Sequence, residues 1–446
     1  MPEQEQIALS PEEEARRAEI RAARQRKKQQ KQEQTQLAGK EHAPPLRRLL
    51  PVVGNSVPLR QPQQHDDRLR RSFTLMTYNV LAQCLCRRDL FPYCKKEHLK
   101  YKARFPILLK EITQTIKPDV ACLQEVDHFD DMFAPALRGA GYDWEYLQKA
   151  PEKDESHGLC IIWKKDLFQK YRYQTLHYDD SPLTHPTPIT PVTGNIAQLL
   201  ALKFVAPATN SSTGILIANT HLYWRPTAQY EKLRQAYVLL NNVVALRKED
   251  LGASWPTLLC GDWNTTPNDG VYRLLTKQPL TDVQRAHLEP VPQPSVSTTP
   301  ATTTSESTVP ESTATSNAPR APSPSQPTLH NPAPTSTVLD RLAALPRLYS
   351  CYSNYQQTHP SHTEDTPSWD GEPAFTTLGS WTGTLDYIFV CAPDDVNNER
   401  TGCDIGPVKL LELPKPSDLE PGLPNSDFAS DHVCLMAEMH LLPSHH

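Results

Sequence analysis

Residues 257–264 read TLLCGDWN, a short apolar run followed directly by Asp262 and Asn264. A run of four to eight apolar residues that ends in turn residues is typical of a buried strand. Taken alone, an Asp and an Asn beside Gly261 are equally well explained as a turn after that strand. The pattern becomes informative because it recurs along the chain.

Further apolar runs are bounded by polar residues in the same way. FTLMTYN ends at Asn79, VACLQE at Glu125 and ILIANTH at His221, while Asp386 opens DYIFV and Asp431-His432 precedes VCLMAEM. In a mixed or antiparallel sheet, the carboxyl ends of some strands share an edge with the amino ends of their neighbours. We therefore expect these polar side chains to line one mouth.

The residue types at these positions indicate a metal-assisted reaction on phosphate. Asn79 taken singly is explained as a turn residue, and Asp431 as a cap, but a buried carboxylate at Glu125 must be paired or bound to metal. Carboxylate and amide oxygens suit Mg²⁺ or Mn²⁺, and Mg²⁺ commonly lets phosphate complete its ligand shell. The pattern predicts hydrolysis of a phosphate ester.

The same residue types suggest a separate role for each residue in that reaction. Asp262 can orient or deprotonate a water molecule, and His432, held by Asp386, can donate to the charge that grows on the phosphate oxygens. His221 and Asn79 would be further donors.

The composition excludes several classes of protein. In 446 residues there are 43 Pro and 16 Gly, and the formal net charge is −5, so any contact with nucleic acid must come from a local patch. No apolar stretch approaches the length of a membrane span, and the acidic start is unlike a targeting presequence. Cys residues inside apolar runs suit a reducing compartment. We expect a cytoplasmic or nuclear protein without a disulfide framework.

The chain is expected to hold one domain at 72–442, interrupted and preceded by other segments. Residues 1–70 form a charged arm, disordered or helical, in which no strand is expected. Residues 285–345 are rich in Ser, Thr and Pro and are expected to form a disordered insertion.

The apolar runs predict strands, and apolar residues at helical spacing predict helices at 107–116 and 230–246. The expected strands are 73–78, 120–123, 159–163, 197–204, 215–219, 257–260, 385–390 and 433–439. Strands and helices therefore mix along the chain, as in an α/β protein.

Six motifs, in order, resemble those of the endonuclease/exonuclease/phosphatase superfamily, which has the DNase I-like fold. They are TYNVLAQ, CLQEVD, NTHLYWRP, CGDWNTTPNDGVYRLL, GTLDYIF and SDHVCLMAE. More narrowly, they are similar to the deadenylase branch, which includes nocturnin, Angel and the fungal NGL-type RNA exonucleases. The resemblance covers about residues 72–440 and implies a four-layer α/β sandwich of two mixed sheets flanked by helices.

The resemblance also implies roles for individual residues. Glu125 would be the principal Mg²⁺ ligand, assisted by Asn79 and Asp431. Asp262 would activate water. The residues implied to contact phosphate, or to orient one that does, are Asn264, His221, His432 and Asp386.

Other positions would face the base or otherwise contact the substrate. The resemblance implies that Pro226, Asn264 and Trp381 surround adenine, although Trp381 is alternatively explained as a buried core residue. His157 matches a His-Gly pair of nocturnin-like members and would contact the substrate.

The favoured function is that of a Mg²⁺-dependent 3′→5′ RNA exonuclease, with Mn²⁺ as an alternative metal. It would act on single-stranded RNA, either poly(A) or the 3′ ends of structural RNA, and release nucleoside 5′-monophosphates. The alternatives are a phosphatase of a small nucleotide such as NADP(H), for which Arg225 and Lys153 are candidate cations, and a catalytically silent RNA-binding scaffold. The spacing of Cys84, Cys86, Cys94 and His98 is too irregular for zinc, and no membrane partner is expected.

Overall fold

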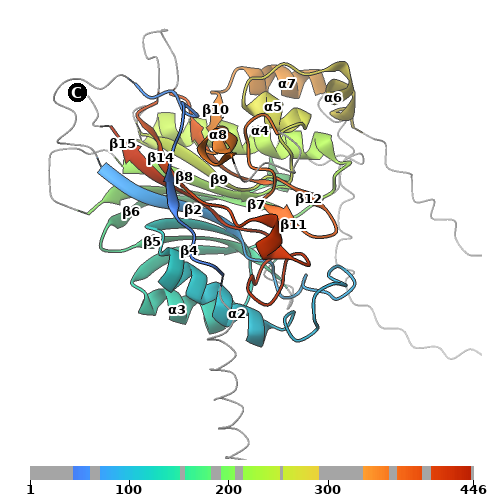
Figure 1. The fold of residues 1–446 in the computed structure, drawn as a ribbon. Helices are drawn as coiled ribbons and strands as arrows, with labels where there is room; N and C mark the ends of the chain where they lie inside the picture. Colours follow the sequence, from blue (N-terminus) through green and yellow to red (C-terminus); the bar gives the residue numbers. More distant parts are fainter. Residues whose placement is uncertain are drawn as a thin grey trace, which may run out of the picture.

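The computed structural model describes most of the chain between residues 44 and 442. The described ranges are 44–60, 71–150, 156–181, 192–205, 214–251, 255–290, 335–360, 369–393 and 403–442. They form two β-sheets packed face to face, with helices on both outer faces (Figure 1). This confirms the predicted four-layer α/β sandwich. No helix among these residues is long and apolar enough to cross a membrane.

The first sheet contains seven strands within the described residues. Their order across the sheet is β1 (Leu49–Pro51), β14 (Ile405–Leu411), β15 (Leu435–Leu441), β2 (Arg71–Asn79), β3 (Val120–Val126), β5 (Gly158–Lys164) and β4 (Tyr142–Gln148). Only the β2–β3 pair is parallel, so the sheet is mixed.

The second sheet contains six strands within the same described ranges. Their order is β10 (Leu348–Ser350), β13 (Asp386–Cys391), β9 (Thr257–Asp262), β8 (Gly214–His221), β7 (Ile196–Phe204) and β6 (Phe168–His177). Here β8 and β9 form the parallel pair. A small hairpin, β11 (Thr377–Leu378) and β12 (Thr382–Gly383), stands apart from both sheets.

Helices cover the two outer faces. The first sheet is covered by α2 (Tyr101–Lys110), which continues as the π-helix η2 (Glu111–Ile116), and by η3 (Phe129–Phe133) with α3 (Ala134–Gly139). The second is covered by α4 (Gln229–Leu246), which continues as the π-helix η5 (Arg247–Leu251), and by α5 (Gly270–Leu275) and α7 (Thr335–Ala343). Shorter elements are η4 (Tyr178–Asp180), α6 (Asp282–His287), α8 (Tyr355–Thr358) and η7 (Pro416–Leu419).

The main core lies between the sheets. Leu75 and Ile161 of the first sheet pack in one cluster with Ile217 and Leu258 of the second, and all four are fully buried. The strands read as near-continuous apolar runs because both of their faces are covered.

The strand pairing brings the predicted polar residues to one edge. Within the second sheet, Asp262 lies directly opposite His221 on β8 and opposite Asp386 on β13. Within the first, β2 and β3 run parallel and end together, and β15 runs antiparallel to β2, so that its amino end lies at the same edge. The expected mouth is therefore formed by both sheets.

The structure corrects two predicted boundaries. Residues 1–70 were expected to hold no strand, yet β1 pairs with β14 along Leu49–Pro51. The predicted insertion at 285–345 is too wide at both ends, because α6 reaches His287 and α7 begins at Thr335. Residues 1–43 and 291–334 lie outside the described residues.

Candidate active site

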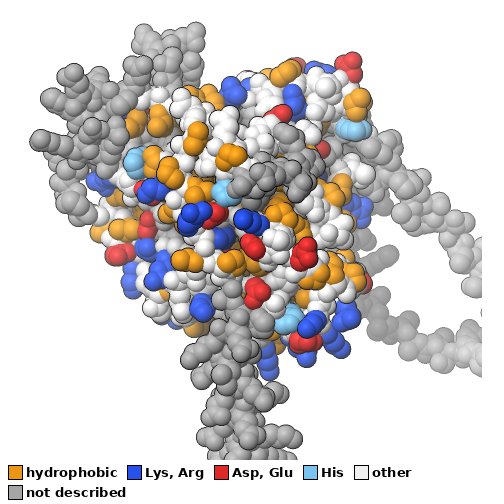
Figure 2. Space-filling model, viewed as in Figure 1, with side chains coloured by type: hydrophobic (Ala, Val, Ile, Leu, Met, Phe, Trp, Pro, Cys, Tyr) orange, Lys and Arg blue, Asp and Glu red, His pale blue; other side chains and the backbone are white. Residues whose placement is uncertain are grey.

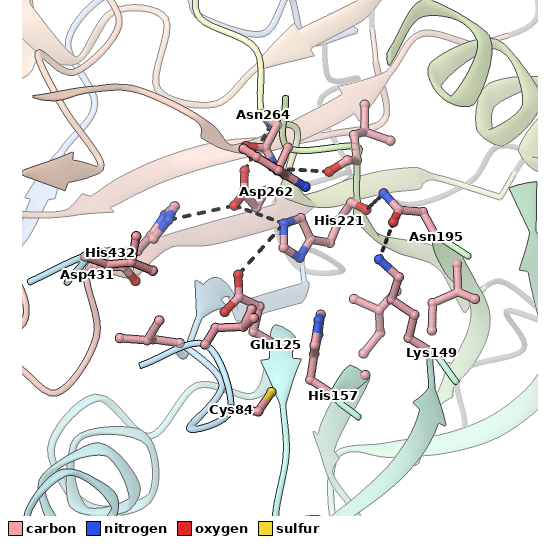
Figure 3. Close-up of a pocket in the computed structure, with 18 of the residues that line it drawn as sticks. Cys84, Glu125, Lys149, His157, Asn195, His221, Asp262, Asn264, Asp431 and His432 are labelled. Carbon is pink, nitrogen blue, oxygen red and sulfur yellow. Dashed lines mark hydrogen bonds and ion pairs between the residues drawn. The ribbon is translucent and has the colours of Figure 1, made fainter. Parts of the chain in front are cut away.

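A cavity of about 630 Å³ opens at the shared edge of the two sheets. Seven of the predicted site residues line it, namely Glu125, His157, His221, Asp262, Asn264, Asp431 and His432 (Figure 3). Asn79 and Asp386 are buried and lie behind them.

Asn79 joins the carboxylates of the two sheets. Its Nδ2 donates to Glu125 Oε1 at 3.0 Å and to Asp262 Oδ2 at 3.0 Å, and its Oδ1 accepts from the Leu81 N–H at 3.0 Å. In this orientation the amide oxygen is occupied and the NH₂ group faces the carboxylates. Asn79 therefore fixes Glu125 and Asp262 by donating to both carboxylates.

A β-bulge aims the Glu125 side chain. The pairing of β3 with β5 shifts register between Leu123 and Val126, and Glu125 adopts φ +58° inside the shift. Left-handed backbone is costly for a residue with a long side chain, and such strain and bulges cluster at functional sites. The bulge lets Glu125 Oε2 accept from the Ala82 N–H at 3.0 Å.

Two histidines that line the cavity, His221 and His157, lie near the Glu125 carboxylate. Burial favours a higher pKa for Glu125, but His221, His157 and the bonds from Asn79 and Ala82 outweigh it and hold the pKa below the usual value. Burial lowers the pKa of His157 to about 4. Glu125 is therefore ionised and His157 neutral near neutral pH.

His221 lies between the two carboxylates (Figure 3). Its Nε2 is 3.5 Å from Asp262 Oδ2 and 4.0 Å from Glu125 Oε1. A substrate oxygen that enters the cavity would meet this nitrogen and the acids on either side of it.

His432 and Asp386 form a buried hydrogen-bonded pair. His432 Nδ1 lies 2.7 Å from Asp386 Oδ2, and His432 Nε2 lies 3.8 Å from Asp262 Oδ2. Burial disfavours charge on the imidazole, but Asp386, with Asp431 and Asp262, raises the pKa of His432 well above its usual value. Asp386 therefore holds Nδ1, and Nε2 is the ring nitrogen on the Asp262 side.

The residues fit a hard divalent cation beside Glu125. Desolvation raises the pKa of Asp431 to about 6, and the negative charge of Glu125 adds to the effect. A cation between two such carboxylates would relieve their repulsion, and oxygen-only donors suit Mg²⁺ and Mn²⁺.

A second group, of two acids and a histidine, fits a cation less well than Glu125 and Asp431 do. Asp262, Asp386 and His432 each offer one atom within 4.8 Å of the others. The raised pKa of His432 keeps that imidazole protonated, and a protonated imidazole has no lone pair for a metal. The Glu125–Asp431 side of the cavity therefore fits a cation better than this second group does.

Of the three residues predicted to face the base, Pro226 and Trp381 are not among the residues that line the cavity. Pro226 is exposed, and Trp381 is 49% exposed in the β11–β12 hairpin. The alternative that Trp381 is a buried core residue is therefore wrong. Asn264 does line the cavity, with φ +49° and its Nδ2 donating to the Leu222 carbonyl at 3.0 Å.

Some lining residues were missed by the sequence analysis. Trp224, which is 62% exposed, lines the cavity three residues after His221, within the quoted motif NTHLYWRP. Lys149 and Asn195 also line the cavity, joined by a hydrogen bond of 2.5 Å from Lys149 Nζ to Asn195 Oδ1. Lys149 follows β4, a strand with no clear apolar signal, so only the position of Trp224 could have been noticed.

Comparison with known proteins gives consistent results. The family model described as Endonuclease/Exonuclease/phosphatase family matches residues 76–432. A probable RNA exonuclease of Schizosaccharomyces pombe is 31% identical over 398 residues, which cover 83% of this chain and 76% of the relative. RNA exonuclease NGL2 of Saccharomyces cerevisiae is 30% identical over 410 residues, which cover 83% of this chain and 78% of the relative.

Among solved structures, ANGEL2, described as a 2′,3′-cyclic phosphatase, matches with a TM-score of 0.60 at 23% identity. The match covers 89% of this chain and 98% of that one, and at this identity it supports the fold. The family model matches residues 76–432, and the ordered motifs and the shared edge of acids and histidines agree with it. The chain therefore belongs to the endonuclease/exonuclease/phosphatase family.

Proposed function

We propose that this protein is a divalent-metal-dependent 3′→5′ RNA exonuclease that releases nucleoside 5′-monophosphates. The observation that carries the proposal is the meeting, in one cavity, of Asp262, two imidazoles and the Glu125–Asp431 pair. The relatives named RNA exonucleases support RNA as the substrate class.

The residues of the chain divide the reaction between them. Asp262 takes a proton from water, the resulting hydroxide attacks phosphorus, and the bond from phosphorus to the 3′-oxygen breaks, so that one water is added across it. His432 donates from Nε2 to a phosphate oxygen, and His221 is a second donor on the same side. The buried Asp386 holds His432 in its protonated form.

Glu125 and Asp431 would hold the metal, for which we propose Mg²⁺, with Mn²⁺ as an alternative. Such a cation, when bound, would neutralise phosphate charge and stabilise the charge that develops on oxygen.

The substrate we propose is a single-stranded 3′ end, including poly(A). Figure 2 shows basic and acidic side chains interspersed on the face in view, with no continuous basic patch over the described residues there. Recognition by stacking on exposed aromatic residues such as Trp224 fits this charge pattern better than recognition by a broad cationic surface.

A phosphatase that acts on a small nucleotide is the second candidate. It is favoured by Lys149 and Arg87, which line the cavity and could meet an additional phosphate. Of the cations named from the sequence, Arg225 instead lies over the Trp224 ring at 5.5 Å, and Lys153 lies outside the described residues.

One assay separates the candidates. The purified protein with Mg²⁺ is offered labelled oligomers of A, U, C and mixed sequence, NADP⁺ and an oligomer that ends in a 2′,3′-cyclic phosphate. Stepwise shortening with release of 5′-monophosphates supports the exonuclease. Release of phosphate from NADP⁺, or opening of the cyclic end, with the RNA otherwise intact contradicts it.

Asp262→Asn tests the proposed base. The exchange keeps the shape and the hydrogen bond from the Asn264 N–H but removes the proton acceptor, so turnover should fall by about 10²–10⁴. The exposed Asp143→Asn serves as the control and should retain full activity. Near-normal turnover of Asp262→Asn would exclude Asp262 from proton transfer.

A further inference from the structure

A second cavity, of about 480 Å³, lies next to the catalytic cavity. We call it the upstream pocket, and its lining residues are Gln83, Cys84, Asp127, His128, Phe129, Asp130, Tyr146, Gln148 and Ser156. Cys84 lines both cavities, so the two spaces are neighbours. None of the predicted site residues lines the upstream pocket.

The hydrogen bonds of the loop after β2 show where the upstream pocket lies relative to Asp262 and Glu125. Asn79, where the loop begins, binds both Asp262 and Glu125. Farther along the loop, the Ala82 N–H binds Glu125, and then the Gln83 N–H binds Asp127 Oδ2 at 2.6 Å.

This sequence of bonds runs from Asp262, past Glu125, to Asp127. Figure 3 likewise shows Cys84 on the far side of Glu125 from Asp262. The upstream pocket therefore lies beyond Glu125 when viewed from Asp262.

The chemistry of the lining favours a polar but uncharged ligand. The side chains of Asp130 and Gln148 have no hydrogen-bond partner among the described residues, so both are available to a ligand. Asp127 is held by the N–H groups of Gln83 and Cys84. Of the described lining residues none is Lys or Arg. A phosphate would meet two carboxylates here, whereas ribose hydroxyls and a base edge could bind both Asp130 and Gln148.

The geometry of phosphoryl transfer connects this pocket to the reaction. The attacking and departing oxygens lie roughly in line through phosphorus. If water is activated at Asp262, the departing oxygen points away from Asp262, toward Glu125 and the space beyond it. In a 3′→5′ exonuclease that oxygen is the 3′-oxygen of the preceding nucleotide.

We propose that the upstream pocket binds the ribose and base of the nucleotide whose 3′-oxygen departs. This inference rests on the proposed exonuclease function. It assigns the catalytic cavity to the nucleotide that is released, and the upstream pocket to the RNA that remains.

The test compares two substrates that release the same product. One is a diadenosine dinucleotide, and the other is the nitrophenyl ester of AMP, in which nitrophenol replaces the upstream nucleoside. Hydrolysis of either gives AMP, but only the dinucleotide can occupy the upstream pocket. The measured quantity is the ratio of kcat/KM for the dinucleotide to kcat/KM for the ester.

We expect Asp130→Ala and Gln148→Ala to lower this ratio by about tenfold when combined, because each removes a hydrogen-bonding group for the upstream nucleoside. The matched controls are Asp131→Ala, which is exposed like Asp130 but lies outside the lining, and Gln169→Ala, an exposed residue of β6. Both controls should leave the ratio unchanged.

The outcomes distinguish this inference from the proposed function. An unchanged ratio in the combined variant, whether or not the two rates fall together, would overturn the assignment of the pocket while leaving the exonuclease intact. A fall confined to the ester would raise the ratio and would overturn the assignment too, because loss of a pocket for the upstream nucleoside must slow the dinucleotide. A wild-type protein that hydrolyses no dinucleotide or longer RNA would overturn the proposed function, and the inference with it.

Discussion

At the carboxyl end of β3, the backbone of Glu125 turns into the left-handed region and brings its carboxylate between Asn79 and the Ala82 N–H. The residue type at this position follows from the sequence, since a carboxylate after a buried run calls for a partner. The bulge that aims it depends on how β3 pairs with β5. The sequence therefore predicts that Glu125 needs a partner, but it does not predict where the side chain points.

The His432–Asp386 pair predicts a pH dependence. Since the pKa of His432 is raised in the folded protein, its stabilising contribution is complete below about pH 6.5 and is lost as the pH rises through the raised pKa. Asp386→Asn removes the main charge that raises this pKa. The basic limb of the kcat/KM profile should therefore move to lower pH in Asp386→Asn, as measured with a labelled oligomer. A basic limb at the same pH in both proteins would show that it reports another group.

The two exposed tryptophans predict separable effects on base recognition. If Trp224 stacks on a base, Trp224→Ala should cost about 1–3 kcal/mol in kcat/KM on A and U oligomers alike, because every base offers a π-face. Trp381→Ala should instead lower the preference for A over U, as the family resemblance implies. Neither change should alter the melting temperature, because both side chains are exposed. An unaltered A-to-U ratio in Trp381→Ala would remove this residue from adenine recognition.

At the scale of elements, α7 shows where composition misleads. It lies at the end of a stretch rich in Ser, Thr and Pro, yet Val338 and Leu342 are buried against the α4 side of the second sheet. Lys277 Nζ donates to the Leu342 carbonyl at 2.8 Å, at the carboxyl end of the helix. Val338 and Leu342 are four residues apart and so lie on one face of the helix. This spacing, rather than the average composition, explains why α7 packs against the domain.

Leu342→Ala should lower the free energy of unfolding by about 2–5 kcal/mol, because it leaves a cavity in a buried cluster. Activity at a temperature well below the melting point should persist, since α7 contributes no cavity residue. Leu339→Ala, where the side chain is only partly buried, is the control with a smaller expected loss. Calorimetry checks both, and an unchanged melting temperature for Leu342→Ala would mean that α7 is not an integral part of the domain.

At the scale of the whole molecule, the segment before β2 is built into the domain. Arg47 is buried, and its NH2 lies 3.1 Å from Glu111 Oε1 while its NH1 donates to the Cys434 carbonyl at 3.0 Å. Tyr78 donates to the other oxygen of Glu111 at 3.1 Å. The network joins the N-terminal segment, η2 and the start of the strand that follows His432.

Arg47→Ala should lower the free energy of unfolding by about 3–5 kcal/mol, because it leaves the Glu111 carboxylate buried without its cation. Arg48→Ala is a matched control, since Arg48 is exposed and its ion pair with Glu412 should be worth at most about 1 kcal/mol. Urea denaturation of the two variants gives the comparison. Equal stability of the two would show that the buried network contributes nothing.

The sequence by itself determined the class of fold and marked the polar residues at the strand ends that the structure brings to one cavity. Buried strands are apolar on both faces, so the runs that end at Asn79, Glu125, His221 and Asp262 stand out by composition. Of the strands that were missed, β4, β6 and β14 are partly exposed or contain Pro407, and β1, β10, β11 and β12 are too short to give that signal.

Only the tertiary structure decided how these residues meet. Whether two strand ends share an edge depends on which strands pair, and in which direction, across separations that range from tens to hundreds of residues. The parallel β2–β3 and β8–β9 pairs, each with an antiparallel neighbour, bring the ends of both sheets to one cavity. The upstream pocket arises in the same way, from a loop after β2 and a turn after β3 that no local pattern brings together.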